Sequence, residues 1–140
     1  MSCLSSPALP PEYSCIKVVK SFEELASTRF ENPFNALCWP RSLAGNFSEV
    51  VEKLGVGEGI TMLDESHLRS LTLSPDGRVA INILLEDLRL LRDRDLDPVL
   101  NCIHGYPRDE DAGPVLTDVF SFHVDSAPVE ADTWLCTYYG

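Results

Sequence analysis

The stretch from Ser74 to Arg92, SPDGRVAINILLEDLRLLR, decides the fold class because its sequence fits two local structures. In one, residues 69–85 form a β-hairpin around a turn. In the other, Ser74 is the N-cap of a helix and Pro75 is its first residue, a position that proline favours. Strand alternation fails after Ile83, whereas apolar residues keep helical spacing at positions 81, 84, 85, 88 and 91. The stretch therefore predicts a helix of several turns.

Short helices and strands are expected on the N-terminal side of this stretch. Ser21 and Glu24 have the spacing of a capping box, which predicts the start of a helix. Phe47 to Leu54 carries a helical apolar stripe, and Gly55 is a C-terminal stop. The expected elements are strands at 16–20 and 35–40, and helices at 22–30, 47–54 and 64–71.

The character of the sequence changes at Pro98. The segments 99–103, 119–124 and 133–139 are short, rich in β-branched and aromatic residues, and separated by loops. Helices first and strands later predict an α+β fold with a mainly antiparallel sheet. We expect a flexible arm at residues 1–14 and one domain at 15–140, helical over about 15–96 and β over about 97–140. Nothing covers the last strand-like segment, which predicts a domain that is incomplete at its C-terminus.

An excess of acidic residues limits the partners of this chain. Its 140 residues include 22 Asp and Glu against 11 Lys and Arg, and the net charge is −11. Nucleic acids and anionic membranes are bound largely through basic clusters, so neither is an expected partner. A salt-bridged helix end is predicted where Arg89, Arg92 and Arg94 alternate with Asp93, Asp95 and Asp97. Without an apolar run of 18 residues or a secretory signal, the expected location is cytoplasmic.

The five cysteines are Cys3, Cys15, Cys38, Cys102 and Cys136. They are scattered without a Cys-x-x-Cys pair, and their odd number argues against a secreted disulfide scaffold. The same spacing argues against structural zinc. We expect most of them to be buried, reduced thiols. For Cys136, a buried inert thiol is favoured over a nucleophile activated by His123.

The segment Phe122-His123-Val124-Asp125 carries the clearest chemistry. In a strand over residues 118–125, the apolar side chains point to one face, and His123 and Asp125 share the other. An imidazole and a carboxylate on one face can supply two ligands to a metal. Two histidines and one carboxylate with open positions form the site of non-haem Fe(II) oxygenases. The simpler alternative is a half-exposed strand whose polar face meets water.

This segment, followed by Leu135-Cys136-Thr137-Tyr138-Tyr139-Gly140, resembles the first metal-binding strand and the next strand of Fe(II)/2-oxoglutarate-dependent dioxygenases. More narrowly, it is similar to a bacterial family of unknown function related to that superfamily. That family also has an Asn-x-x-x-Trp stretch before a helix, like Asn35 to Trp39 here. The resemblance extends over about residues 35–140. It implies N-terminal helices packed on the antiparallel sheet of a partial double-stranded β-helix, a cupin-like jelly roll.

Residue by residue, the resemblance assigns His123 and Asp125 as the first two Fe(II) ligands. It places Thr137 or Tyr138 near the 2-oxoglutarate cosubstrate, and it implies oxidation of an unknown small-molecule or protein side-chain substrate. The family's second histidine and its basic residue for 2-oxoglutarate lie well downstream of His-x-Asp, where this sequence has no His, Arg or Lys. His104, on the preceding strand-like segment, is an alternative third ligand. A structural role is expected for His67, the remaining histidine.

A non-catalytic domain is the competing hypothesis. It would be a binding module or a degenerate relative, in which His123 and Asp125 are structural. An enzyme needs this pair in a concave, partly dry pocket with a third ligand within reach. A binding module leaves the pair on an open face or holds it in ordinary hydrogen bonds. An unclosed sheet edge would also allow the chain to self-associate.

Overall fold

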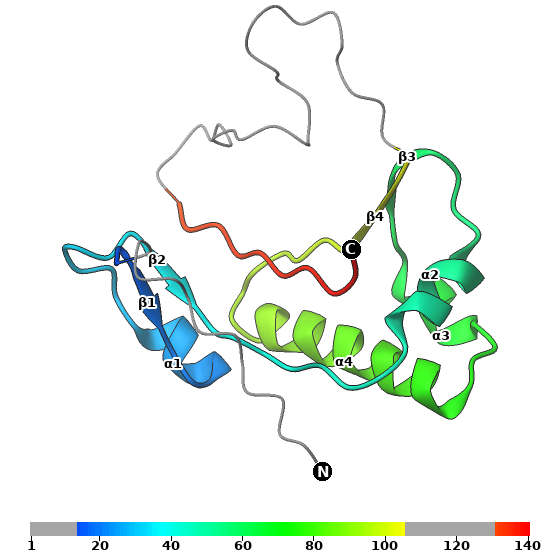
Figure 1. Cartoon of the computed structure of the whole chain (residues 1–140), viewed down its shortest axis with the longest axis horizontal. Coiled ribbons are helices and arrows are strands. Elements are labelled where there is room, and N and C mark those ends of the chain that lie inside the picture. Colours follow the sequence, from blue (N-terminus) through cyan, green and yellow to red (C-terminus); the bar gives the residue numbers. More distant parts are fainter. Residues whose placement is uncertain (1–13, 106–130) are drawn as a thin grey trace, which may run out of the picture. The chain divides into compact units, whose positions relative to one another are not determined.

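The structure, a computed structural model, describes residues 14–105 and 131–140 (Figure 1). The chain divides between Leu43 and Ala44 into two compact units, and each is described by itself. The predicted flexible arm at residues 1–14 lies outside the described residues except at its last position. The predicted strand at 119–124 lies entirely outside them.

The first unit contains a small β-α-β arrangement. β1 (Ile16–Val18) and β2 (Ala36–Cys38) pair in parallel. α1 (Phe22–Ser27) connects them, because a parallel pair needs a crossover and not a tight turn. The N–H of Val19 extends the pairing by donating to the carbonyl of Cys38 (2.9 Å). The sequence predicted all three elements, with longer ranges.

The predicted cap of α1 is present. The Ser21 hydroxyl oxygen accepts a hydrogen bond from the N–H of Glu24 (3.0 Å), and the Glu24 carboxylate accepts one from the N–H of Lys20 (2.7 Å). A side-chain cap of this kind stabilises a helix by about 1 kcal/mol. Val19, 1% exposed, is the buried apolar residue of the described part of this unit. Local hydrogen bonds therefore organise much of the first unit.

Trp39, directly after β2, contacts an aromatic ring and a guanidinium of the first unit. Its ring lies 6.5 Å from that of Phe22, measured between centroids, and the Arg41 guanidinium lies 4.4 Å from its centroid. A cation over an indole ring contributes about 0.5–1 kcal/mol at an exposed site. These contacts link the start of α1 to the chain that follows β2.

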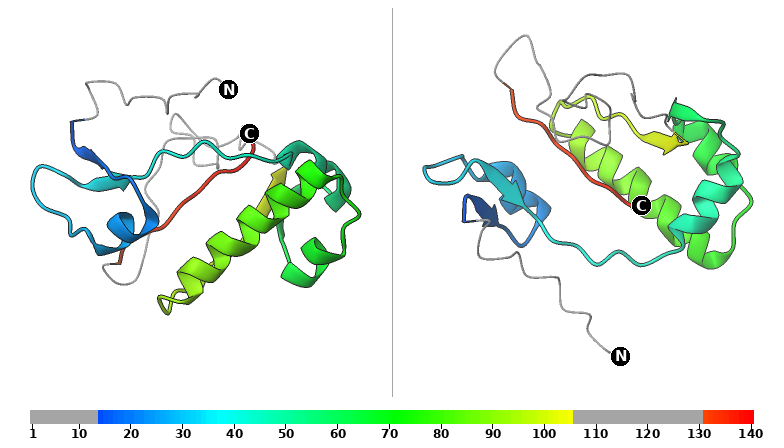
Figure 2. Two further views of the ribbon diagram at one scale, coloured as in Figure 1. Left: turned by 90° about the horizontal axis from the view of Figure 1, so that it is seen from below. Right: turned by 45° about the horizontal axis from the view of Figure 1, so that its top comes forward.

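The second unit is built around α4 (Pro75–Arg92), which confirms the helical alternative for the stretch 74–92. The Ser74 hydroxyl oxygen caps it by accepting from the N–H of Gly77 (3.2 Å), with Pro75 as the first helical residue. α2 (Phe47–Leu54) and α3 (Glu65–Ser70) both contact α4. Figures 1 and 2 show α4 as the longest helix in the described part of the chain. The buried apolar side chains of this unit are Phe47, Val50, Leu54, Leu68, Ala80, Ile81, Leu84 and Leu88.

Glu49 of α2 binds the N-terminus of α4. Its carboxylate accepts hydrogen bonds from the hydroxyl (2.5 Å) and the N–H (2.7 Å) of Ser74. These two bonds, the hydroxyl's first, lower the pKa of Glu49. A glycine makes room for the carboxylate, because a Cβ at Gly77 would lie 2.5 Å from Glu49 Oε2.

The loop before α2 lies directly against the backbone of α4. Gly45 has φ +99°, and a Cβ there would lie 2.6 Å from the backbone nitrogen of Ala80. The N–H of Asn46 donates to the carbonyl of Asp76 in the first turn of α4 (2.9 Å). Only glycine fits both the backbone angle and the approach at position 45.

Two arginines of α4 connect it to α3. The Arg78 guanidinium donates to the carbonyls of Leu71 (2.7 Å) and Arg69 (3.4 Å), which are free at the C-terminal end of α3. Arg92, at the other end of α4, forms an ion pair with Glu65 in the first turn of α3. The short helix therefore runs along α4 in the opposite direction.

A two-stranded antiparallel pair completes the described part of the second unit. It consists of β3 (Gly59–Met62) and β4 (Asn101–His104), with Ile60 opposite Ile103. Both of these side chains, and Met62 on the same face, are at least half exposed. The sequence predicted β4 two residues early and did not predict β3.

The predicted jelly roll is wrong. The described residues form an α/β structure with two separate two-stranded sheets, one of them parallel. Thr133 to Tyr139, predicted as a strand, has no strand partner among the described residues and runs as an extended segment past α4 (Figures 1 and 2). Strand-forming residues become a strand only when a partner edge is available, and a sequence pattern does not show that edge.

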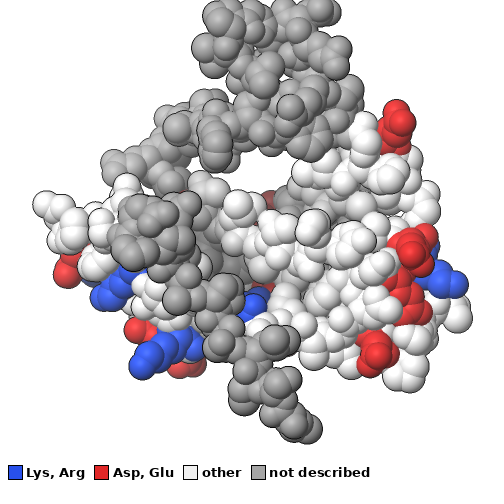
Figure 3. Space-filling model, in the orientation of Figure 1, with Lys and Arg blue, Asp and Glu red and all other residues white. Residues whose placement is uncertain are grey.

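The excess of acidic over basic residues in the sequence is visible on the surface. On the face shown in Figure 3, Asp and Glu side chains are prominent over the region of α2 and α3. None of the helices in the described residues has the length and apolarity that crossing a membrane requires.

Candidate functional site

The two predicted metal ligands, His123 and Asp125, lie outside the described residues. The other histidines are described: His67 is exposed on α3, and His104 is exposed at the end of β4. In residues 14–105 and 131–140, no three His, Cys, Asp or Glu side chains come together in a way that could hold a metal. His123 and Asp125 are donors of the type that Fe(II) accepts.

Tyr138, predicted near a cosubstrate, is attached to two helices of the second unit. Its hydroxyl donates to Asp87 Oδ2 of α4 (2.8 Å), and its ring stacks on Phe47 of α2 with centroids 5.7 Å apart. Aromatic pairs at this separation contribute about 0.5–1.5 kcal/mol beyond the area that they bury. Tyr138 therefore holds the segment 131–140 against α2 and α4, while its neighbour Thr137 is exposed.

Partial burial raises the pKa of the Tyr138 hydroxyl, and the hydrogen bond and charge of Asp87 raise it further. The Cys136 thiol contributes in the same direction, so it lies close to the hydroxyl. The tyrosine is therefore a neutral donor at physiological pH. It acts as an attachment point, and in this arrangement its hydroxyl is committed to Asp87.

The thiols differ from the prediction of buried cysteines. Cys15, Cys38 and Cys102 are free and half-buried, and Cys136 is free and exposed. The prediction for Cys136 placed it in an apolar strand, between Leu135 and Thr137. Because residues 131–140 form no strand in the described structure, the Cys136 side chain faces solvent.

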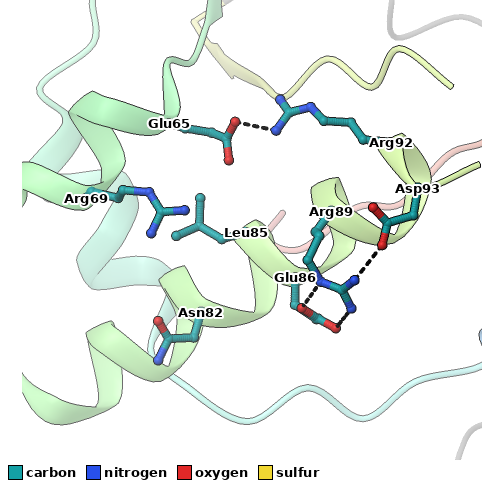
Figure 4. Close-up of a pocket in the computed structure, with 8 residues that line it drawn as sticks. All are labelled: Glu65, Arg69, Asn82, Leu85, Glu86, Arg89, Arg92 and Asp93. Atoms are coloured by element: carbon teal, nitrogen blue, oxygen red, sulfur yellow. Dashed lines mark hydrogen bonds and ion pairs between the residues drawn. The ribbon is translucent and has the colours of Figure 1, made fainter. Parts of the chain in front are cut away.

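A pocket of about 370 Å³ lies between α3 and α4 (Figure 4). It opens to solvent and is formed by charged and polar side chains around one leucine. We call it the α3–α4 groove. Its lining residues are Glu65, Arg69, Asn82, Leu85, Glu86, Arg89, Arg92 and Asp93.

Ion pairs fix most of the charged side chains of the α3–α4 groove. The Arg89 guanidinium binds Glu86 and Asp93, each with an N–O distance of 2.5 Å. The hydrogen bond from Arg89 lowers the pKa of Glu86, and the same bond raises the pKa of Arg89. Arg92 pairs with Glu65 across the groove. The salt-bridged helix end predicted from alternating Arg and Asp is thus present for Arg89 and Asp93.

The α3–α4 groove itself was not predicted. The sequence showed a charged end of α4 and a helix after Asp64, but it gave no sign that these two elements face each other. The available signal was Glu65 and Arg69, spaced i and i+4 on one face of α3. Two charged positions on a short helix are usually solvated, so this signal is weak.

Comparison with known proteins adds no relative from which a function could be transferred. No family model, curated protein or solved structure matches this chain.

Proposed function

We propose that this chain carries part of a non-haem iron site of the dioxygenase type, with His123 and Asp125 as two of the ligands. The observation that supports the proposal is the His-x-Asp spacing in an alternating segment, followed by the Leu135–Gly140 sequence that resembles the next strand of such enzymes. Bound iron would supply the oxidising chemistry, with 2-oxoglutarate as cosubstrate and a substrate of unknown identity. The third ligand is not assigned.

The described residues include contacts that hold the chain after the predicted metal ligands. Tyr138 lies 13 residues after Asp125 and is attached to α4 and α2 through Asp87 and Phe47. We propose that this attachment positions the chain that follows the metal ligands. If Tyr138 instead binds 2-oxoglutarate, as the resemblance implies, its hydroxyl must leave Asp87, and exposed Thr137 is the residue with a free side chain.

Anaerobic calorimetric titration with Mn(II), which replaces Fe(II) without oxidation, tests the metal site. We expect one ion per chain, and we expect the double variant His123→Ala/Asp125→Ala to lose it. His67→Ala is the matched control, because His67 is exposed on α3 and should not change binding. An unaltered chain that binds no Mn(II), or a double variant that binds as well as the parent, would contradict the proposal.

A non-catalytic binding module is the second candidate function. The α3–α4 groove favours it, because its volume of about 370 Å³ lies in the range of small-molecule sites, about 300–1,000 Å³. This candidate does not need a metal. Ligand binding that is unchanged by His123→Ala/Asp125→Ala would support it.

A further inference from the structure

One arginine of the α3–α4 groove is not committed to a partner. Arg89 and Arg92 are held by carboxylates of the groove, and the Arg78 guanidinium nearby is held by backbone carbonyls. The Arg69 guanidinium has no hydrogen bond or ion pair within the described part of the chain. Figure 4 shows it extending from α3 toward Leu85, into the space between the two helices. A guanidinium in this position presents several N–H donors to a ligand.

The charges of the groove are separated. Its three carboxylates, Glu65, Glu86 and Asp93, pair with only two guanidinium groups, so this network has one excess negative charge. Arg69 contributes one positive charge. A ligand that carries one negative and one positive group therefore complements the groove better than an anion or a cation does.

The polar and apolar positions fit such a ligand. A guanidinium binds a carboxylate in a two-pronged geometry, and the Asn82 carboxamide beside it can donate a further hydrogen bond. Leu85, half-buried between Arg69 and the ion-pair network, offers an apolar surface to the body of the ligand. Asp93 binds Arg89 through one oxygen and has its second oxygen available, whereas both oxygens of Glu86 accept from Arg89 and keep further lone pairs. These two carboxylates can accept hydrogen bonds from an ammonium group.

We propose that the α3–α4 groove binds a small zwitterion of the α-amino-acid type, with its carboxylate on Arg69 and its ammonium group toward Glu86 and Asp93. The inference gives the ligand class for the second candidate function, the binding module. It is independent of the proposed metal site, because it uses no residue of that site.

Titration of the ¹⁵N-labelled full chain with L-leucine, followed by NMR, tests the inference. We expect shifts at the α3 and α4 amides around Arg69 and Leu85. Arg69→Gln should weaken binding about tenfold or more, the loss expected for a hydrogen bond to a charged group. Arg29→Gln removes an arginine from the other unit and should leave binding unchanged. Because Arg69 is exposed, its variant should fold, and Asn82→Ala provides a second test.

Two analogues of L-leucine separate the possible outcomes. L-leucinamide lacks the carboxylate and N-acetyl-L-leucine lacks the ammonium group, so each should bind at least about tenfold more weakly. If either analogue binds as well as L-leucine and still depends on Arg69, the zwitterion class is wrong while a binding module remains. If none of the three compounds shifts the groove amides, both the inference and the binding function of this groove are overturned.

Discussion

Of the nine buried apolar residues in the described part of the chain, eight belong to the second unit and one, Val19, to the first. The first unit is organised by the cap of α1, the parallel strand pair and the contacts of Trp39. The second unit adds burial and close backbone approach around α4 to its caps and ion pairs. One chain can therefore contain a unit that is stabilised by buried side chains and close packing, and another that is stabilised mainly by local hydrogen bonds and ring contacts.

The largest expected effect is on the core of the second unit. Leu68 of α3 is 0% exposed, and Leu68→Ala should destabilise by about 2–5 kcal/mol through lost burial and a cavity. The equivalent change in the first unit, Val19→Ala, removes less apolar surface and should cost roughly 1.5 kcal/mol. Native-state hydrogen exchange measures both units in one experiment.

Leu135→Ala is the control for these core changes, because Leu135 is 91% exposed and its truncation should be nearly neutral. We expect Leu68→Ala to accelerate exchange in α2–α4 and to leave the amides of β1 and β2 unchanged. Equal acceleration in both units would show that they unfold together, and the comparison between them would fail.

The next effect concerns the two glycines that approach α4. Gly45→Ala introduces a Cβ 2.6 Å from the backbone nitrogen of Ala80 at φ +99°, and neither the backbone atom nor the angle can adjust easily. Strain and overpacking of this kind cost about 1–3 kcal/mol each. Gly77→Ala places a Cβ 2.5 Å from Glu49 Oε2, which is the end of a movable side chain, and 3.0 Å from Leu73 Cβ, which lies in the loop before α4. Alanine also gains about 1 kcal/mol in helix propensity.

Urea denaturation of the two glycine variants distinguishes backbone from side-chain contact. We expect Gly45→Ala to be destabilised by about 2–4 kcal/mol, and Gly77→Ala to change by less than about 1 kcal/mol. If Gly77→Ala is as damaging as Gly45→Ala, the Glu49 carboxylate is fixed on Ser74 and cannot move aside.

A smaller effect is expected at the cap of the first unit. Ser21→Ala removes the acceptor of the Glu24 N–H and should cost about 1 kcal/mol, which is about fivefold faster exchange in α1. Ser42→Ala is the control, because Ser42 is exposed and makes no hydrogen bond within the described residues. An unchanged exchange rate in Ser21→Ala would mean that α1 is stabilised by packing, contrary to the comparison.

The sequence predicted helices better than sheets, for a physical reason. Helix starts depend on neighbours in the chain, so Ser21, Asn46 and Ser74 with the residues after them determine α1, α2 and α4 locally. Strand pairing is decided by residues distant in sequence. The parallel partner of β1 and the existence of β3 could not be read from a local pattern, and the expected antiparallel jelly roll was wrong as a result.

The candidate sites show the same division. The pairing of Arg89 with Asp93 was predictable because the two residues are four positions apart on one helix. The pairing of Arg92 with Glu65 was not, because it depends on how α3 lies along α4. Tyr138 was predicted on a neighbouring strand, but the structure shows that its hydroxyl binds Asp87. The assignment of His123 and Asp125 as metal ligands stays a prediction.

The smallest expected effect is the acid sensitivity that Glu49 gives to the second unit. Bonds from Ser74 lower the pKa of Glu49 in the folded chain, with a smaller contribution from the charge of Lys53. A carboxyl group with a lowered folded pKa stabilises above its unfolded pKa, about 4.3, and this contribution is lost as the pH falls through the folded value. Glu49→Gln should therefore lower stability at neutral pH and reduce the loss on acidification below about pH 4.

Urea unfolding measured from pH 7 to pH 3, with α2–α4 exchange as a second readout, checks this prediction. The variant should keep part of the acid sensitivity, because the pKa values of Asp64 and Glu86 are also lowered, by Ser66 and Arg89. Glu52→Gln removes the same formal charge from the same helix, and Glu52 has no hydrogen bond or ion pair in the described structure. If the pH profile of Glu49→Gln equals that of Glu52→Gln, the Glu49–Ser74 bonds do not link α2 to α4 in solution. The packing of α2 against α4 would then depend on the glycines and the buried apolar side chains of the second unit.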